Sequence, residues 1–157
     1  MQDTEENVFW ATVHKMDVES KIRALSNKFF YDGVYPNLAL QGELLGPGIQ
    51  GNKYDLKEHV ILWFNLFDIN SFKYFHGDDF FELVEEVGLK TVPLINKFIL
   101  NNTVDELVEM SKDKSKLNDK IHREGIVIRP CEEKEDKKLG RVSFKVINPD
   151  FLLKFGE

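Results

Sequence analysis

The sequence lacks several features that would place it in a special class of proteins. It contains one cysteine, Cys131, in 157 residues, so no internal disulfide can form, and we expect a reducing, cytoplasmic location. No apolar run approaches the roughly eighteen residues of a membrane-spanning helix. The acidic first residues lack the basic-then-apolar order of a secretion signal. With no internal repeat and no linker-like segment, the chain is expected to be one domain.

Basic residues are not in excess either. The 21 lysines and arginines are outnumbered by 27 aspartates and glutamates, which gives a net charge of −6. This balance excludes nucleic-acid binding through a global basic surface, so any RNA or DNA would have to be held in a local groove. Hydrophobic residues at 42% and charged residues at 31% indicate a folded domain with a substantial core.

Helical patterns alternate irregularly with strand patterns. Asp3 with Glu6 and Thr103 with Glu106 have capping-box spacing. We predict helices over 3–15, 18–29, 78–87 and 103–112. We predict strands or extended segments over 38–45, 59–69, 92–95, 124–129 and 142–147. This mixed order favours an α+β fold over a doubly wound parallel sheet.

The strand over 59–69 is strongly apolar. Simple alternation places Trp63, Asn65 and Phe67 on one of its faces and Leu66 on the other. The mixed-sign run over 132–138, between the last two strands, is typical of a solvated hairpin tip.

The last two strands each carry a charge where a plain core strand has none. Glu124 opens the first strand, and Lys145 lies inside the second. An acid and an ammonium on neighbouring strands suit a site for a metal-bound nucleotide, because the carboxylate serves the cation and the ammonium serves the phosphate. Within an apolar strand, Lys145 requires a partner, since an isolated buried charge is costly.

Four segments in order resemble the ATP-dependent RNA ligases of the covalent nucleotidyltransferase superfamily, which also contains DNA ligases and capping enzymes. The resemblance extends over essentially the whole chain and is closest to the Deinococcus-type RNA ligases. The segments are Gln41-Gly42-Glu43-Leu44-Leu45-Gly46-Pro47-Gly48-Ile49-Gln50, Leu66-Phe67-Asp68-Ile69, Arg123-Glu124-Gly125-Ile126-Val127-Ile128-Arg129 and Ser143-Phe144-Lys145-Val146-Ile147-Asn148.

The resemblance implies a nucleotidyltransferase (adenylation) domain made of antiparallel sheets with flanking helices. It also implies ATP and Mg²⁺ or Mn²⁺ as cofactors, and RNA ends or a nicked duplex as partners, with no membrane. In the implied chemistry, a lysine takes AMP from ATP, AMP passes to an RNA 5′-phosphate, and an RNA 3′-hydroxyl displaces it. In such phosphoryl transfers the protein mainly positions groups and offsets charge.

By resemblance, Glu43 accepts a hydrogen bond from the ribose and Phe67 stacks on adenine. Glu124 is implied to place the metal, and Lys145 to contact the α-phosphate. Glu124 and Lys145 would be the catalytic residues, and Glu43, Phe67 and Lys145 the nucleotide-binding ones. Plainer alternatives remain open: a water-facing acid for Glu43, core packing for Phe67 and a surface ion pair for Glu124.

The pattern departs from the family at two places. The nucleophile motif Lys-x-Asp-Gly is not found in these 157 residues: Lys15 is followed by Met16-Asp17-Val18, and no lysine precedes Asp32-Gly33. We therefore expect residues 1–157 to be a single partial domain, N-terminally incomplete and inactive alone. The alternative is a non-catalytic nucleotide- or RNA-binding module. Ile147 also stands where phage-type ligases have a second lysine, which fits the Deinococcus-type branch better.

Other residues give weaker signals. The loop over 46–51 is rich in glycine but is not a Walker loop, because no Gly-Lys-Ser/Thr follows. Lys53 and Lys57, near this loop, are weak candidates for contacts to RNA phosphates, and for Arg129 a phosphate contact and a surface ion pair are equally open. The four histidines lack the spacing of metal ligands, and Cys131 is interpreted as an ordinary thiol.

Overall fold

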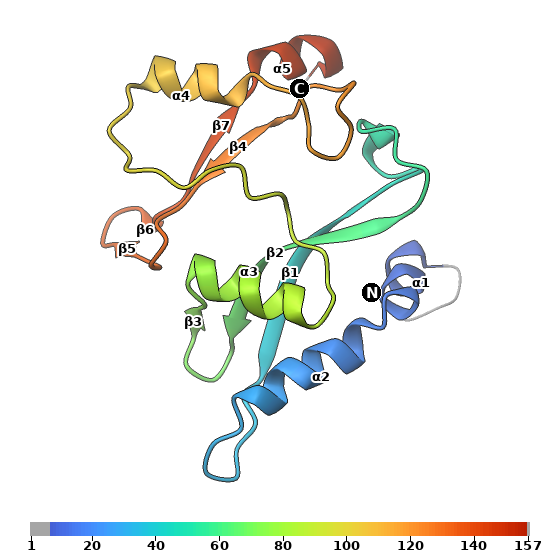
Figure 1. The fold of residues 1–157 in the computed structure, drawn as a ribbon, viewed down its shortest axis with the longest axis vertical. Coiled ribbons are helices and arrows are strands. Elements are labelled where there is room, and N and C mark those ends of the chain that lie inside the picture. The colour runs from blue at the N-terminus through green and yellow to red at the C-terminus, as the bar shows by residue number, and fades with distance from the viewer. Residues whose placement is uncertain (1–6, 157) are drawn as a thin grey trace. The chain divides into compact units, whose positions relative to one another are not determined.

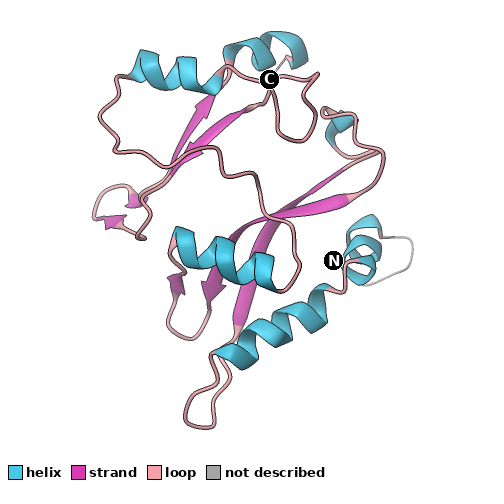
Figure 2. Cartoon of the chain, viewed as in Figure 1, coloured by secondary structure: helices cyan, strands magenta, loops and turns pink. Residues whose placement is uncertain are grey.

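The computed structural model describes residues 7–156. They form two compact units. The first unit comprises the described residues up to Leu45 together with Glu58–Val92, and the second comprises Gly46–Lys57 and Pro93 onwards. Both units combine helices with antiparallel strands (Figure 2), which confirms the predicted α+β class.

Three helices belong to the first unit: α1 (Val8–Lys15), α2 (Val18–Lys28) and α3 (Gly77–Glu86). Helix α1 begins after Asn7, whose side-chain oxygen accepts hydrogen bonds from the backbone amides of Phe9 and Trp10, as an N-cap does. The predicted capping box of Asp3 and Glu6 lies outside the described residues.

The sheet of the first unit contains β1 (Leu38–Leu45), β2 (Val60–Asp68) and the short β3 (Lys73–Tyr74), in the order β1-β2-β3. All neighbours are antiparallel, and a register shift lies between Gln41 and Gly42. Gln41 is opposite Asn65 and Gly42 is opposite Trp63, which leaves Phe64 as the extra residue of a β-bulge in β2.

The bulge corrects the predicted faces of β2. Trp63 and Leu66 both belong to the hydrophobic core, although they are three residues apart and simple alternation would separate them. The extra residue at the bulge reverses the alternation, so Trp63 lies on the core face and not with Asn65 and Phe67.

The core of the first unit lies between one face of the sheet and the three helices (Figure 1). Its buried members are Val18, Ile61, Trp63, Leu66, Phe80, Val84 and Leu89. Because Leu38, Leu40 and Leu44 of β1 pack against this cluster, the side chains of Gln41 and Glu43 lie on the opposite face.

The second unit is built on β4 (Gly125–Ile128) and β7 (Phe144–Ile147), which pair antiparallel. Helix α4 (Val104–Ser111) begins with the predicted capping box: the Thr103 side chain accepts from the Glu106 amide, and the Glu106 side chain accepts from the Thr103 amide. A small hairpin of β5 (Glu135–Asp136) and β6 (Gly140–Arg141) stands where a hairpin tip was predicted.

Two further elements of the second unit were not predicted from the sequence. The one-turn 3-10 helix η1 covers Gln50–Asn52, and helix α5 covers Pro149–Phe155 after the N-cap Asn148. Among the described residues, no helix has the length and apolar character to cross a membrane.

Candidate functional site

The sheet face of the first unit that points away from its helices carries two of the predicted site residues, Glu43 and Phe67. Between them, the Asn65 amide donates to the Gln41 side-chain oxygen at 2.7 Å. Glu43 is opposite Leu62, whereas Phe67 is opposite Ala39. The two positions are therefore four residues apart along β1, roughly 13 Å.

Glu43 follows directly after the β-bulge. A Cβ atom at Gly42 would lie 2.6 Å from Trp63 Cε3 and 2.9 Å from the Leu62 carbonyl oxygen, so only glycine allows β1 to approach β2 this closely. Glu43 itself is exposed. Bulges commonly occur next to functional sites, and this one lies directly before Glu43 in the β1–β2 register.

Phe67 is part of an aromatic cluster. Its ring lies 4.8 Å from that of Tyr74 and 5.3 Å from that of Phe72, both in edge-to-face geometry. The core cluster of the described residues does not include Phe67, although the sequence left core packing open for it. Its half-buried ring is held by these two neighbours in edge-to-face contact.

The second unit brings the other two predicted residues into direct contact. The Lys145 ammonium forms an ion pair with Glu124 Oε1. Lys145 is opposite Val127 in the β4–β7 ladder, and Glu124 lies directly before β4. The Lys145 and Glu124 side chains are 54% and 34% exposed, so the pair remains accessible to a ligand. Lys145 is therefore not the buried charge that the sequence suggested: it is exposed, and its ion-pair partner is Glu124.

The backbone around Glu124 is fixed from several sides. Its amide donates to the Tyr54 hydroxyl at 3.3 Å, and its carbonyl accepts from the Asn148 amide at 2.8 Å. The fully buried Asn148 also donates through its side chain to the Arg123 carbonyl at 2.9 Å. Arg123, 8% exposed, donates to the carbonyls of Met110 and Ser111 at the end of α4.

Sequence reasoning missed these supporting residues. Arg123 adjoins the recognised Glu124, and Asn148 before Pro149 has the pattern of an N-cap followed by proline at the first helical position. The Asn148-Pro149 pattern was therefore the sequence signal that could have revealed Asn148 as a structural residue. Nothing in the sequence links Tyr54 to Glu124, because 70 residues separate them.

The structure also shows the contacts of the weaker candidates, which are the glycine-rich loop and three basic side chains. In the glycine-rich loop, Gly48 and Gly51 adopt positive φ angles of 77° and 69°. Lys53 places its ammonium 5.6 Å from the centre of the Phe151 ring, and Lys57 forms an ion pair with Asp55. The Arg129 guanidinium donates to the Ser143 hydroxyl at 3.3 Å. These contacts favour structural roles for the three cations.

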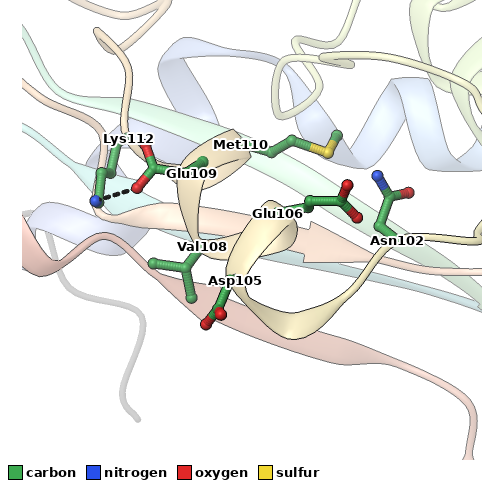
Figure 3. Close-up of a pocket in the computed structure, with 7 residues that line it drawn as sticks. All are labelled: Asn102, Asp105, Glu106, Val108, Glu109, Met110 and Lys112. Carbon is green, nitrogen blue, oxygen red and sulfur yellow. Dashed lines mark hydrogen bonds and ion pairs between the residues drawn. The ribbon is translucent and has the colours of Figure 1, made fainter.

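A divalent cation would find few protein ligands here. The described residues contain no group of three or more histidine, cysteine or acidic side chains that could hold one. A magnesium ion nevertheless fits a single carboxylate when phosphate oxygens and water complete its octahedron, and Glu124 supplies one. A pocket of about 630 Å³ along α4 is lined by Asp105, Glu106 and Glu109 among others (Figure 3), and includes none of the predicted site residues.

Comparisons with known proteins agree with the fold. The family model described as RNA ligase matches residues 1–147. An arginine-to-alanine variant of the Naegleria gruberi RNA ligase, solved with ATP and Mn, matches with a TM-score of 0.82 and 28% identity over 98% of this chain. A glutamate-to-alanine variant with ATP and Mn gives 0.83 and 27% over 100%. The same ligase with PPi gives 0.81 and 28% over 98%. No curated protein matches the chain significantly.

The α+β architecture therefore matches part of an RNA ligase nucleotidyltransferase domain. This chain belongs to the RNA ligase family. It spans 42–43% of the length of the matched Naegleria ligase chains.

Proposed function

We propose that the chain is the C-terminal part of an ATP-dependent RNA ligase adenylyltransferase domain, of the Deinococcus type and acting in the cytoplasm. The observation that carries the proposal is the contact between Glu124 and Lys145 on neighbouring strands. Family membership and the relatives solved with ATP and Mn support it. Residues 1–157 constitute one partial ligase domain under this proposal, although their contacts form two compact units.

Each predicted residue has one task in this proposal. Phe67 stacks on adenine, and Glu43 accepts a hydrogen bond from the ribose. Lys145 donates to the α-phosphate as charge develops there. Glu124 holds Mg²⁺ or Mn²⁺, which when bound offsets phosphate charge during nucleotidyl transfer. The RNA partner is a strand end or a nicked duplex, held locally because the net charge of −6 disfavours a broad electrostatic contact.

Replacing Phe67 by alanine is expected to weaken ATP binding in the presence of Mn²⁺ by roughly tenfold or more, because base stacking on an aromatic ring contributes about 1–3 kcal/mol. Binding of inorganic triphosphate, which has no base, should not change. Titration calorimetry with ATP and with inorganic triphosphate measures the two affinities. The matched control is Phe98→Ala, which removes a ring of the second unit that is 40% exposed. No binding of ATP to the unmodified protein would refute the proposed function.

We also expect no covalent adenylate on this chain. After incubation with ATP and Mg²⁺, intact-mass measurement should show the unmodified protein, because the sequence carries no Lys-x-Asp-Gly motif to supply the attacking amine. ATP binding without the adduct would suit either a partial ligase or a non-catalytic binding module. Ligation on addition of a ligase segment that carries the motif would favour the partial ligase. A stoichiometric AMP adduct would instead show that another lysine acts as nucleophile.

A further inference from the structure

Two amide side chains lie on the same sheet face as Glu43 and Phe67. Gln41 of β1 is opposite Asn65 of β2, and the Asn65 side-chain nitrogen donates to the Gln41 side-chain oxygen at 2.7 Å. The hydrophobic core cluster formed by the described residues includes neither of them. We call these two residues the amide pair.

The two members of the amide pair differ in exposure. Asn65 is only 6% exposed, whereas Gln41 is exposed. A buried amide is costly unless its polar atoms are bonded, so the Asn65 donor favours an oxygen at the position of the Gln41 carbonyl. Turning the Gln41 amide over would place two nitrogens against each other, and two N–H groups would lose their acceptor. The buried amide therefore sets the orientation of the exposed one.

The bonded oxygen leaves the Gln41 nitrogen as the group that the amide pair offers to a ligand. Within residues 7–156, this nitrogen has no hydrogen-bond partner. A side-chain amide nitrogen carries two N–H donors and cannot accept. The exposed end of the amide pair is thus a donor.

The position of the amide pair decides which part of a nucleotide it would meet. Gln41 is two residues from Glu43 along β1, and Asn65 is two residues from Phe67 along β2, roughly 7 Å in each case. Under the proposed function, the base stacks on Phe67 and the ribose binds Glu43. The amide pair then lies between base and sugar, where a purine presents the edge that carries N3 and C2.

This edge distinguishes the purines from one another. Adenine presents only the acceptor N3 there, whereas guanine adds the donor amino group at C2. A protein donor can bond to adenine N3, but it meets another donor when guanine is bound. Neither of these two donors then has an acceptor, which lowers the affinity.

We propose that Gln41, oriented by Asn65, selects adenine over purines that carry a 2-amino group. The inference rests on the proposed function and deepens it, because it names the residue that reads the base at the same site. Gln41 is the specificity-determining residue, and Asn65 is a positioning residue that acts through it. Phe67 does not make this choice, since stacking on an aromatic ring tolerates every base.

The test compares nucleotides that differ only in the 2-amino group: ATP with 2-amino-ATP, and inosine triphosphate with GTP. In titration calorimetry of the unmodified protein with Mn²⁺, the 2-amino group should weaken binding about tenfold in both comparisons. The two nucleotides of each comparison have the same charge, so phosphate and metal contacts cancel in the ratio of affinities.

The Gln41→Glu variant changes only the group that faces the ligand. One carboxylate oxygen still accepts from Asn65, and the other is an acceptor where the amide was a donor. The preference should therefore reverse, so that this variant binds 2-amino-ATP more tightly than ATP. Gln50→Glu, the same substitution at an exposed glutamine of η1, is the matched control and should keep the original preference.

A second variant tests the role of Asn65. Asn65→Ala removes the buried donor and frees the Gln41 amide to rotate, so the ratio of the affinities for ATP and 2-amino-ATP should fall close to one. A residue that only joined the two strands would change stability and leave this ratio as it was. Circular dichroism establishes that each variant is folded.

Equal affinities within both comparisons, or an unchanged preference in Gln41→Glu, would overturn the inference, because the amide pair would then only join two strands. In that case ATP binding that still depends on Phe67 would leave the proposed function standing. Failure of all four nucleotides to bind would instead refute the proposed function, and this inference with it.

Discussion

Replacing Gly125 by alanine is expected to destabilise the second unit by about 3 kcal/mol or more, the upper range for overpacking. An alanine Cβ at this position would lie 2.1 Å from the Val146 carbonyl oxygen and 3.0 Å from the Ile147 Cα. Both are backbone atoms of β7, so no side-chain rotation relieves the clash. The strands would have to separate, and the hydrogen bonds of the ladder would be lost.

The effect should be local and should reach the candidate site. Hydrogen exchange of the β4 and β7 amides should accelerate, whereas the amides of β2 should keep their protection. Because β4 positions Glu124 opposite the strand of Lys145, binding of ATP should weaken as well. Val127→Ala is the matched control in the same strand, since this side chain is 54% exposed and its truncation should change stability by about 0.5 kcal/mol or less. Normal stability of the alanine variant at Gly125 would contradict the close approach of the strands.

Local patterns of the sequence predicted most of the elements. The capping box of Thr103 and Glu106 was found where its spacing placed it, because such a cap depends on residues within one turn. The β-bulge at Phe64 could not be predicted in this way. It coincides with the close approach of Gly42 to the Trp63 ring across two strands, and no local pattern encodes that contact.

The candidate site shows the same difference between features that local sequence predicts and features that depend on contacts between distant segments. The charges of Glu124 and Lys145 stood out locally because they interrupt apolar strands, and the structure brings them together. The network that holds Glu124 joins Tyr54, Arg123 and Asn148 from distant segments, so it appears only in the folded chain. Likewise, the exposed ring of Phe72 was not predicted, because a single aromatic residue in a sequence does not reveal whether it faces water.

Exchanging the charges of Glu124 and Lys145 should separate a structural ion pair from a nucleotide site. Glu124→Lys alone and Lys145→Glu alone each place like charges together and should lower stability by about 1 kcal/mol or less, since exposed pairs contribute little. The double exchange restores opposite charges and should recover most of that loss in chemical denaturation.

Nucleotide binding should respond differently from stability. In the double exchange a carboxylate stands at position 145, where the proposal needs an ammonium for the phosphate. An ammonium stands at position 124, where the proposal needs a carboxylate for the metal. The Lys145 hydrogen bond to the phosphate contributes about 1.5–3 kcal/mol, so losing it together with the metal ligand should weaken ATP binding with Mn²⁺ by more than about tenfold. Titration calorimetry of the folded double variant with ATP and Mn²⁺ measures this loss of affinity. Binding equal to that of the unmodified protein would mean that the pair only joins two strands, and the roles proposed for Glu124 and Lys145 would be wrong.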